Sequence, residues 1–265
     1  MKALIKENLP GDHPWQNHIH WFDTIDSTNT RAKELAIAGA PEGTVVAAGS
    51  QSAGRGRLGR SFQSPEHAGV YMSVILRPNC PPAQLMHLTC AAAAAMCDAV
   101  ENAAGFRPGI KWTNDLVYAR RKLAGILTEL SLNPAGKVDY AVIGIGINCC
   151  QHPHDFPPEI RDIAGSLTSD TGRPVDPARV AAAMADSLWQ MDRELLSGKT
   201  QMLDRYRAAC VTLGQEISLL RGEEVRHGKA LDIDDAGGLI VEFGPGVRET
   251  VTSGEVSIRG MYGYL

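Results

Sequence analysis

A series of closely spaced strand signals in the middle of the chain constrains the fold more than any other feature. Between residues 110 and 147, short apolar segments alternate with turn residues, and the strongest turn signal is Asn133-Pro134-Ala135-Gly136. This alternation is typical of neighbouring β-strands. We therefore expect a sheet with strands at residues 110–112, 116–118, 122–132 and 138–147.

Helical patterns and further strands surround this region. Ser27, Thr28 and Asn29 provide N-cap chemistry for a helix over residues 31–38, which Gly39 ends. The other predicted elements are strands at 18–25, 44–48 and 70–76 and helices at 83–104, 177–196 and 201–210.

The sequence pattern changes near residue 213. From there, short strands alternate with turns rich in glycine and aspartate, such as residues 234–238 (Asp-Asp-Ala-Gly-Gly). This tail has about the size of a small closed barrel. We therefore predict two domains, residues 1–213 and residues 214–265.

Charge and hydropathy argue against several classes of protein. The net charge of -4 disfavours a dominant nucleic-acid footprint, which is normally basic. No apolar run approaches the ~20 residues of a membrane-spanning helix, and the N-terminus lacks the apolar core of a signal peptide. We therefore expect a cytoplasmic protein.

Neither the cysteines nor the histidines form a recognisable metal site. The six cysteines lack zinc-ligand spacing, and a disulfide framework is unexpected at this length in a reducing compartment. Reduced, partly buried thiols are expected instead. The pairs His18/His20 and His152/His154 have i, i+2 spacing without a third ligand, so surface or packing roles fit them better.

Residues 54–60 (Gly-Arg-Gly-Arg-Leu-Gly-Arg) form the first candidate functional motif. Glycine lets the backbone curl so that N–H groups converge on an anion, and arginine offers forked donors to carboxylate and phosphate. One loop could thus hold both groups together, as activation of an acid by ATP requires. Alone, the motif fits equally well a solvated loop or an RNA contact.

Three further clusters combine polar or glycine residues with predicted strands. Residues 111–115 (Lys-Trp-Thr-Asn-Asp) place a cation, an amide and a carboxylate on one turn. Lys122 begins an apolar strand, where its charge is costly to bury unless an anion meets it. Alternate glycines in residues 144–148 (Gly-Ile-Gly-Ile-Asn) leave one face of the strand without side chains, which suits the floor of a pocket. Each cluster alone also fits a structural role: a polar turn, a snorkelling lysine or close strand packing.

In this order, the four clusters closely resemble the biotin–protein ligase family. Asp26-Ser27-Thr28-Asn29 precede them, Gln51-Ser52-Ala53 lead into the arginine loop, and the matching stretch runs from about residue 19 to 150. The resemblance implies an α+β fold, with a mixed-sheet catalytic domain of the biotin/lipoate ligase type followed by a small SH3-like β-barrel. It also implies the short form of the family, which lacks an N-terminal DNA-binding domain. About eighteen residues precede the first predicted strand, and these are too few for such a domain.

The resemblance implies a two-step reaction that uses ATP and Mg²⁺. The carboxylate of biotin first attacks the α-phosphate, which gives biotinyl-5'-AMP and pyrophosphate. A lysine amine on the biotin carboxyl carrier domain of a biotin-dependent carboxylase then attacks the mixed anhydride. The implied partners are biotin, ATP and this carrier domain, with a homodimer as a further option and neither DNA nor membrane binding expected.

The resemblance also assigns roles to individual residues. Lys122, Arg55 and Asp115 are the expected catalytic residues: Lys122 neutralises developing charge, and Asp115 orients the incoming lysine or helps bind magnesium. Arg55 and Arg57 are expected to close the loop over the intermediate and exclude water. The residues expected to bind biotin are Ser27, Thr28, Asn29, Gln51, Arg55, Gly56, Arg57 and Lys122. Those expected to bind ATP or the adenylate are Arg55, Arg57, Arg60, Phe62, Lys111, Asn114, Lys122 and Asn148.

Two positions depart from the family pattern, and two alternatives stay open. Thr113 stands where proline is frequent, and Phe62 stands where tryptophan is frequent, which makes base stacking less extensive. A lipoate–protein ligase shares the architecture, although the Gly-Arg-Gly-Arg loop favours biotin. A nucleic-acid-binding module using the arginine loop is the alternative from another class, which the acidic charge disfavours.

Overall fold

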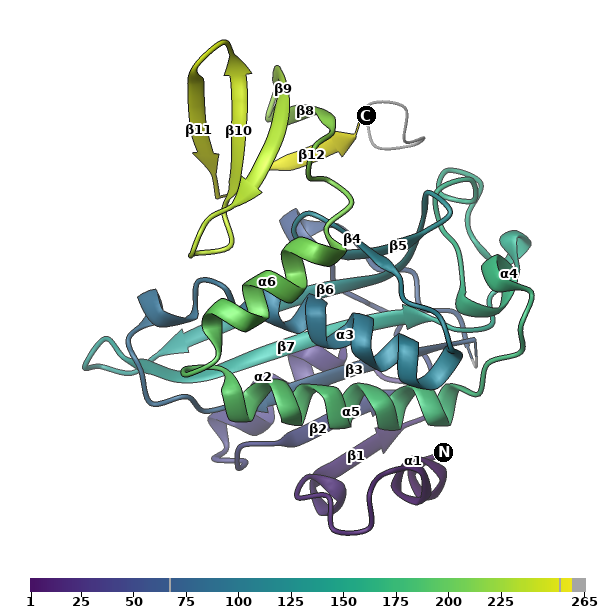
Figure 1. Ribbon diagram of the computed structural model, residues 1–265. Coiled ribbons are helices and arrows are strands. Elements are labelled where there is room, and N and C mark those ends of the chain that lie inside the picture. The colour runs from purple at the N-terminus through teal and green to yellow at the C-terminus, as the bar shows by residue number, and fades with distance from the viewer. Residues whose placement is uncertain (67, 253, 259–265) are drawn as a thin grey trace.

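A seven-stranded mixed sheet forms the centre of the larger domain (Figure 1). The computed structural model describes residues 1–66, 68–252 and 254–258. The strand order is β1-β2-β3-β7-β6-β5-β4; β1 and β2 are parallel, and the other neighbouring pairs are antiparallel. The strands are β1 (Ile19–Phe22), β2 (Thr44–Ala48), β3 (Gly69–Leu76), β4 (Gly109–Lys111), β5 (Asp115–Tyr118), β6 (Arg121–Leu132) and β7 (Val138–Asn148).

Helices cover both faces of this sheet. The α-helices are α1 (Lys2–Asn8), α2 (Thr28–Ile37), α3 (Leu88–Ala104), α4 (Leu167–Thr171), α5 (Pro177–Glu194) and α6 (Lys199–Ala209). Short 3-10 helices lie at Gln16–His18, Arg57–Gly59, Pro82–Leu85 and Pro153–Asp155. In Figure 1, α3, α5 and α6 lie across the near face, and α2 packs behind the sheet against β2, β3 and β7.

The alanine-rich helix α3 is the centre of the hydrophobic core. Its small side chains allow close packing against α5, α6 and the sheet. Among the described residues, Pro82–Ala104 is long and apolar enough to cross a membrane by length and composition, but 72% of its apolar window is buried inside the molecule. That burial is typical of a core helix in a globular domain.

The second domain is a five-stranded antiparallel sheet, which fits the expected SH3-like barrel. Its strands have the order β11-β10-β9-β8-β12. Side chains of the larger domain bind its backbone: Trp112 Nε1 donates to Gly237 O over 3.0 Å, and Arg207 Nη2 donates to Ile233 O over 2.7 Å. The strands are β8 (Glu216–Arg221), β9 (Glu224–Ile233), β10 (Leu239–Gly244), β11 (Val247–Val251) and β12 (Glu255–Ile258).

Most predicted elements are confirmed, and the differences have physical reasons. The predicted strand at 44–48 matches β2, and Gly39, with a φ of 88°, follows the end of α2 as expected. The first strand is shorter than predicted because it lies at the sheet edge, and its ladder with β2 ends at Phe22. Helices α1 and α4 were not predicted; they are only 7 and 5 residues long.

Candidate active site

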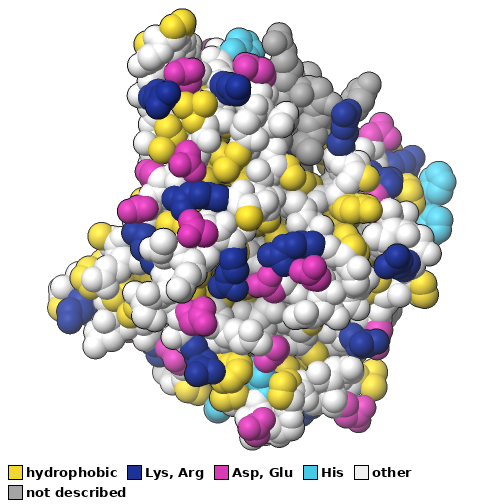
Figure 2. Space-filling view, in the orientation of Figure 1, with side chains coloured by type: hydrophobic (Ala, Val, Ile, Leu, Met, Phe, Trp, Pro, Cys, Tyr) yellow, Lys and Arg dark blue, Asp and Glu magenta, His cyan; other side chains and the backbone are white. Residues whose placement is uncertain are grey.

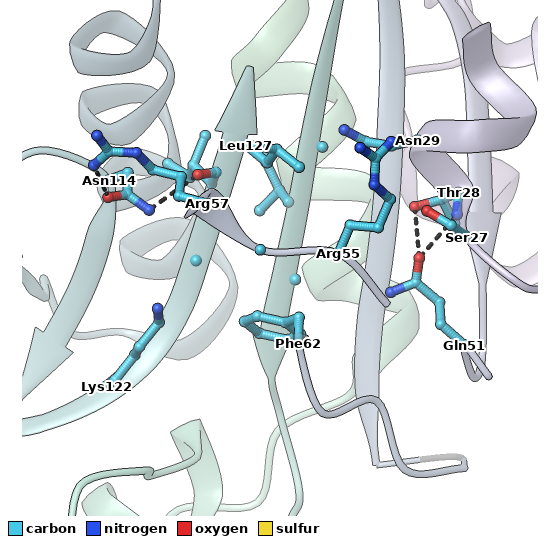
Figure 3. A pocket seen from close by; sticks show the side chains of 16 residues that line it. Ser27, Thr28, Asn29, Gln51, Arg55, Arg57, Phe62, Asn114, Lys122 and Leu127 are labelled. Atoms are coloured by element: carbon cyan, nitrogen blue, oxygen red, sulfur yellow. Dashed lines mark hydrogen bonds between the residues drawn. The ribbon is translucent and has the colours of Figure 1, made fainter. Parts of the chain in front are cut away.

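One polar pocket of about 450 Å³ collects residues from six separate segments of the chain (Figure 3). The start of α2, the segment around Gln51, the arginine loop, the turn between β4 and β5, and strands β6 and β7 all contribute. We call it the polar pocket. It is lined by Ser27, Thr28, Asn29, Gln51, Arg55, Gly56, Arg57, Phe62, Asn114, Lys122, Gly125, Ile126, Leu127, Gly144, Ile145 and Gly146.

Glycines on neighbouring strands make the floor of the polar pocket. Gly125 of β6 pairs with Gly146 of β7, and the Phe62 ring lies over both. A Cβ atom at Gly146 would come within 2.5 Å of Phe62 Cε1, and one at Gly144 would overlap the amide of Asn29. The alternate glycines therefore floor a pocket, as the sequence suggested, because they admit these two side chains.

The start of α2 is held in the pocket by local capping and by Gln51. Ser27 Oγ accepts a hydrogen bond from Thr30 N, so Ser27 is the N-cap and residues 27–29 face the pocket at the helix start. Gln51 Oε1 accepts from Thr28 N over 2.8 Å and from Thr28 Oγ1 over 3.1 Å. Gln51 Nε2 in turn donates to Ser64 Oγ. The Gln51 side chain is thus oriented before any ligand binds.

A carboxylate that sequence reasoning missed, Glu129 of β6, contacts Asn29 and Arg55, two residues that line the polar pocket. It accepts hydrogen bonds from Lys33 and Asn29, both over 2.9 Å, and its Oε1 lies 3.4 Å from Arg55 Nη1. Burial would raise the pKa of Glu129, but the hydrogen bonds from Lys33 and Asn29 and the charges of Lys33 and Arg55 hold the pKa below its ordinary value. Glu129 is therefore an anion at neutral pH.

The arginine loop folds back on itself beside the pocket. Gly56 N donates to Arg60 O, and Phe62 N donates to Gly54 O, which closes a small hairpin-like turn. Arg57 Nη1 donates to Asn114 Oδ1 over 2.8 Å, so the loop is tied to the turn between β4 and β5. The loop thus brings two arginines to the rim, one at each side of the pocket (Figure 3).

Lys122 lies where three cavities meet. Its Nζ is 2.7 Å from Asp115 Oδ1 and 5.9 Å from the centre of the Phe62 ring. The two charged side chains are 30% and 13% exposed, so a ligand can reach the lysine while the carboxylate stays largely covered. Figure 3 shows Lys122 pointing toward the space beside Phe62. The expected anion partner of this lysine is present in the protein itself.

A largely apolar cavity of about 720 Å³, which we call the apolar cleft, adjoins Lys122 and Phe62. Its outer wall is the segment after β7, which contributes Phe156, Ile160, Ile163 and Ala164. This segment binds the start of β6: Lys122 N donates to Ile163 O, and Gly165 N donates to Lys122 O. The cleft is lined by Arg60, Ser61, Phe62, Gln63, Asp115, Lys122, Asn148, Phe156, Ile160, Ile163 and Ala164.

Asn148 lines the apolar cleft but uses its amide within the protein. Its Nδ2 donates to Gly165 O over 2.9 Å, and its Oδ1 accepts from Gln151 Nε2. It therefore holds the wall of the cleft. Phe156 and the apolar residues near it are further functional candidates that sequence reasoning missed. The available signal was a set of large apolar residues in a loop directly after a site motif.

A third cavity, of about 650 Å³, reaches the smaller domain, and we call it the interdomain cleft. Arg60, Lys111 and Asp115 line it together with Lys122, and Gly254 and Val256 contribute from the smaller domain. Every residue predicted for the site therefore lies at one of three adjoining cavities. Their roles in binding stay predictions.

The donors around Asp115 fit a magnesium ion held mainly by substrate phosphates. Mg²⁺ in nucleotide sites takes one or two carboxylates, with phosphates and water as the other ligands. Asp115 supplies a carboxylate beside Lys122. Within the described part of the chain, no group of three or more His, Cys, Asp or Glu side chains is placed to hold a metal.

All six cysteines are free, as expected, with five buried and Cys150 exposed.

Comparisons with known proteins agree with this geometry. Residues 21–148 match the model of the Biotin/lipoate A/B protein ligase family, and residues 212–259 match the Biotin protein ligase C terminal domain. The chain is 39% identical to the bifunctional ligase/repressor BirA of Bacillus subtilis, over 88% of this chain and 71% of that protein. It is 34% identical to the biotin–[acetyl-CoA-carboxylase] ligase of Paracoccus denitrificans, over 89% of this chain and 98% of that protein.

A solved structure shows the same fold over both domains. The biotin protein ligase from Aquifex aeolicus in complex with biotin and ATP matches with a TM-score of 0.75 and 29% identity. The match covers 91% of this chain and 98% of that one. Because two family models match and relatives above 30% identity align over most of their length, this chain belongs to the biotin protein ligase family.

Proposed function

We propose that this chain activates biotin with ATP and transfers it to a lysine of a biotin carboxyl carrier domain. The observation that carries the proposal is the position of Lys122, which lies between a polar pocket and an apolar cleft. Activation of an acid requires one cation where the acid and the nucleotide phosphate meet. Relatives named as biotin–[acetyl-CoA-carboxylase] ligases support the choice of acid and acceptor.

The head of biotin occupies the polar pocket beside Thr28 and Gln51. These residues present hydroxyl and amide groups that suit a cyclic urea, and Leu127 and Ile145 add apolar contact for the ring carbons. The carboxylate then points toward Lys122. This placement puts the reacting oxygen where the pocket meets the two clefts.

The adenine of ATP occupies the apolar cleft, between Phe62 and the wall that contains Phe156. Aromatic and aliphatic side chains suit the flat face of a purine. In the first step, a biotin carboxylate oxygen attacks the α-phosphorus and pyrophosphate leaves. Lys122 stabilises the negative charge that builds on the phosphate oxygens, and Arg57 closes over the product. Magnesium at Asp115 would supply further neutralisation of phosphate charge.

In the second step, the acceptor lysine attacks the acyl carbon and AMP leaves with the bonding electron pair. The attacking amine must be neutral, so its ammonium form first loses a proton to solvent, and the nitrogen gives up a second proton to solvent as the amide forms. Asp115 lies 2.7 Å from Lys122 and orients the incoming amine beside this lysine. The arginine loop excludes water, which would otherwise hydrolyse the mixed anhydride.

The domain boundary, assembly and location are proposals of the same kind. A boundary at residues 213/214 is supported by the match of the C-terminal family model from residue 212 and by the start of β8 at Glu216. A homodimer through the β1 edge of the sheet is part of this proposal, because β1 has a strand neighbour on one side and the outer edge of β4 is paired with residues 210–211. Cytoplasmic location and the lack of DNA binding rest on sequence composition. On the face in Figure 2, acidic and basic side chains are interspersed.

The test is biotin-dependent exchange of pyrophosphate into ATP, followed by transfer of biotin to a purified carrier domain. We expect exchange with biotin and labelling of one lysine. Lipoate serves as the competing acid, because lipoate ligases share the fold. Exchange with lipoate but not biotin would overturn the choice of substrate, and salt-dependent nucleic-acid binding without exchange would overturn the enzyme assignment.

A further inference from the structure

A continuous chain of hydrogen bonds runs from Glu129 into the polar pocket. Asn29 Nδ2 donates to Glu129 Oε2 over 2.9 Å. Ser73, a fully buried residue of β3, lies 2.6 Å from Asn29 Oδ1 and 2.8 Å from Thr28 Oγ1. Thr28 Oγ1 reaches Gln51 Oε1 over 3.1 Å. The chain therefore joins the rim carboxylate to the side chains that face the ligand.

The charge on Glu129 decides the direction of the hydrogen bonds at Asn29 and Ser73. An ionised carboxylate only accepts hydrogen bonds, so the Asn29 amide must turn its Nδ2 toward Glu129. Asn29 Oδ1 then faces Ser73 and only accepts. Ser73 has a single hydroxyl proton, which it donates to Asn29.

The fixed direction leaves the pocket rich in acceptors. Ser73 Oγ, Thr28 Oγ1 and Gln51 Oε1 are three neighbouring oxygens that share one hydroxyl proton, that of Thr28. Among the residues that the structure describes, the backbone N–H of Thr28 is the other donor at this cluster. Unused lone pairs therefore remain on Thr28 Oγ1 and Gln51 Oε1, which line the pocket, and a ligand with N–H groups can satisfy them.

We propose that Glu129 is a specificity-determining positioning residue, which acts through Asn29 and Ser73 to make the pocket accept N–H donors. The proposal rests on the proposed function, because the ring N–H groups of the biotin head are the donors concerned. A neutral residue at position 129 would let the Asn29 amide turn over. Nδ2 would then donate to Ser73, and the freed Ser73 proton would use up lone pairs at Thr28.

Glu129 also contacts Arg55, so the test must separate the head of the ligand from its carboxylate. Biotinol, in which an alcohol replaces the carboxylate, keeps the ring N–H groups but offers no anion to Arg55. We expect Glu129→Gln to weaken biotinol binding about tenfold, measured by calorimetry. Glu34 forms an exposed pair with Arg31 on α2, the helix that carries Asn29, which makes Glu34→Gln the matched control, with unchanged binding expected.

A double-mutant cycle with Ser73 shows whether the effect passes through the chain. Ser73→Ala removes the hydroxyl proton that Glu129→Gln would release toward Thr28, so the double variant should bind biotinol about as well as Ser73→Ala alone. In pyrophosphate exchange, Glu129→Gln should show a raised KM for biotin. Its kcat should stay within about twofold of the wild-type value, since Lys122 and Asp115 are unchanged. Circular dichroism and the unfolding midpoint verify that each variant is folded.

The outcomes separate the two proposals. If the wild-type protein binds neither biotin nor biotinol, the proposed function fails. If the wild type binds biotinol but Glu129→Gln binds it equally well, or the losses in the cycle simply add, the role of Glu129 is wrong while the function stands. A double variant that binds biotinol about tenfold more weakly than Ser73→Ala would also overturn the inference, because the effect of Glu129 would then bypass Ser73.

Discussion

Lys122 and Asp115 form an ion pair between strands β6 and β5, with Nζ 2.7 Å from Oδ1. The carboxylate is the more buried partner, so it fixes the lysine while leaving the lysine accessible from the pocket. A half-covered pair of this kind adds little to stability. Its value lies in holding one cation at the point where acid and phosphate meet.

Lys122→Ala should therefore abolish adenylation while the fold persists. We expect biotin-dependent pyrophosphate exchange to fall by at least about 100-fold, because a preorganised charge is lost from the transition state. Lys137→Ala, at an exposed turn between β6 and β7, is the matched control. Exchange at the wild-type rate in Lys122→Ala, with the control also active, would refute the assigned role.

Arg57→Gly should loosen the closed loop. Arg57 binds Asn114 over 2.8 Å and lines the polar pocket, so its loss removes both a tether and a cation over the intermediate. We expect bound biotinyl-AMP to leave at least about tenfold faster in a dissociation experiment with labelled biotin. Asn114→Ala should give a smaller increase, and the exposed Arg173→Gly none. An unchanged rate in Arg57→Gly would remove this residue from the lid.

Gly144→Ala should impair binding of biotin by filling the pocket floor. The added methyl group would overlap the Asn29 amide, which is held on its other sides by Ser73 and Glu129. We expect the Kd for biotin to rise at least about tenfold, with ATP affinity little changed. Gly11→Ala is the control, because no atom lies within 4 Å of its added Cβ. Wild-type affinity in Gly144→Ala would show that Asn29 moves freely.

Asp192 makes the stability of the protein depend on pH. Burial, together with the charge of Glu42, raises the pKa of Asp192 to about 7. A raised folded-state pKa means that the protonated form is favoured on folding. The contribution of the protonated Asp192 carboxyl to the free energy of unfolding is complete below the unfolded-state pKa near 3.8. This contribution is lost as the pH rises through about 7.

Asp192→Asn should consequently stabilise the protein at pH 8 but not at pH 4. We expect a gain on the order of 2 kcal/mol in the free energy of unfolding at pH 8, measured with urea, since each pKa unit corresponds to about 1.4 kcal/mol and partial exposure reduces the effect. Asp162→Asn, at an exposed position, should give no such gain. Equal stability of Asp192→Asn and wild type at pH 8 would contradict the shift.

Local signals in the sequence predicted most of the elements. Ser27 as N-cap, the turn at residues 133–136 and the strand at 44–48 depend on neighbours a few residues away, so single-sequence patterns suffice. The end of β1 depends on its partner strand, and α1 depends on burying Ile5 against α5. Neither contact is visible in a local pattern.

The sequence by itself determined the family, through Gln51, the arginine loop, Asp115 and Lys122 in a fixed order. Only the tertiary structure decided how these residues are held. Glu129 meets Asn29 across 100 residues of sequence and Lys33 across 96, and the loop after β7 meets Lys122 across some forty. Such contacts form because the sheet places β6 beside β7 and under α2. The sequence specifies the chemical groups of each side chain. The partners and the charge state of that side chain depend on which residues folding brings next to it.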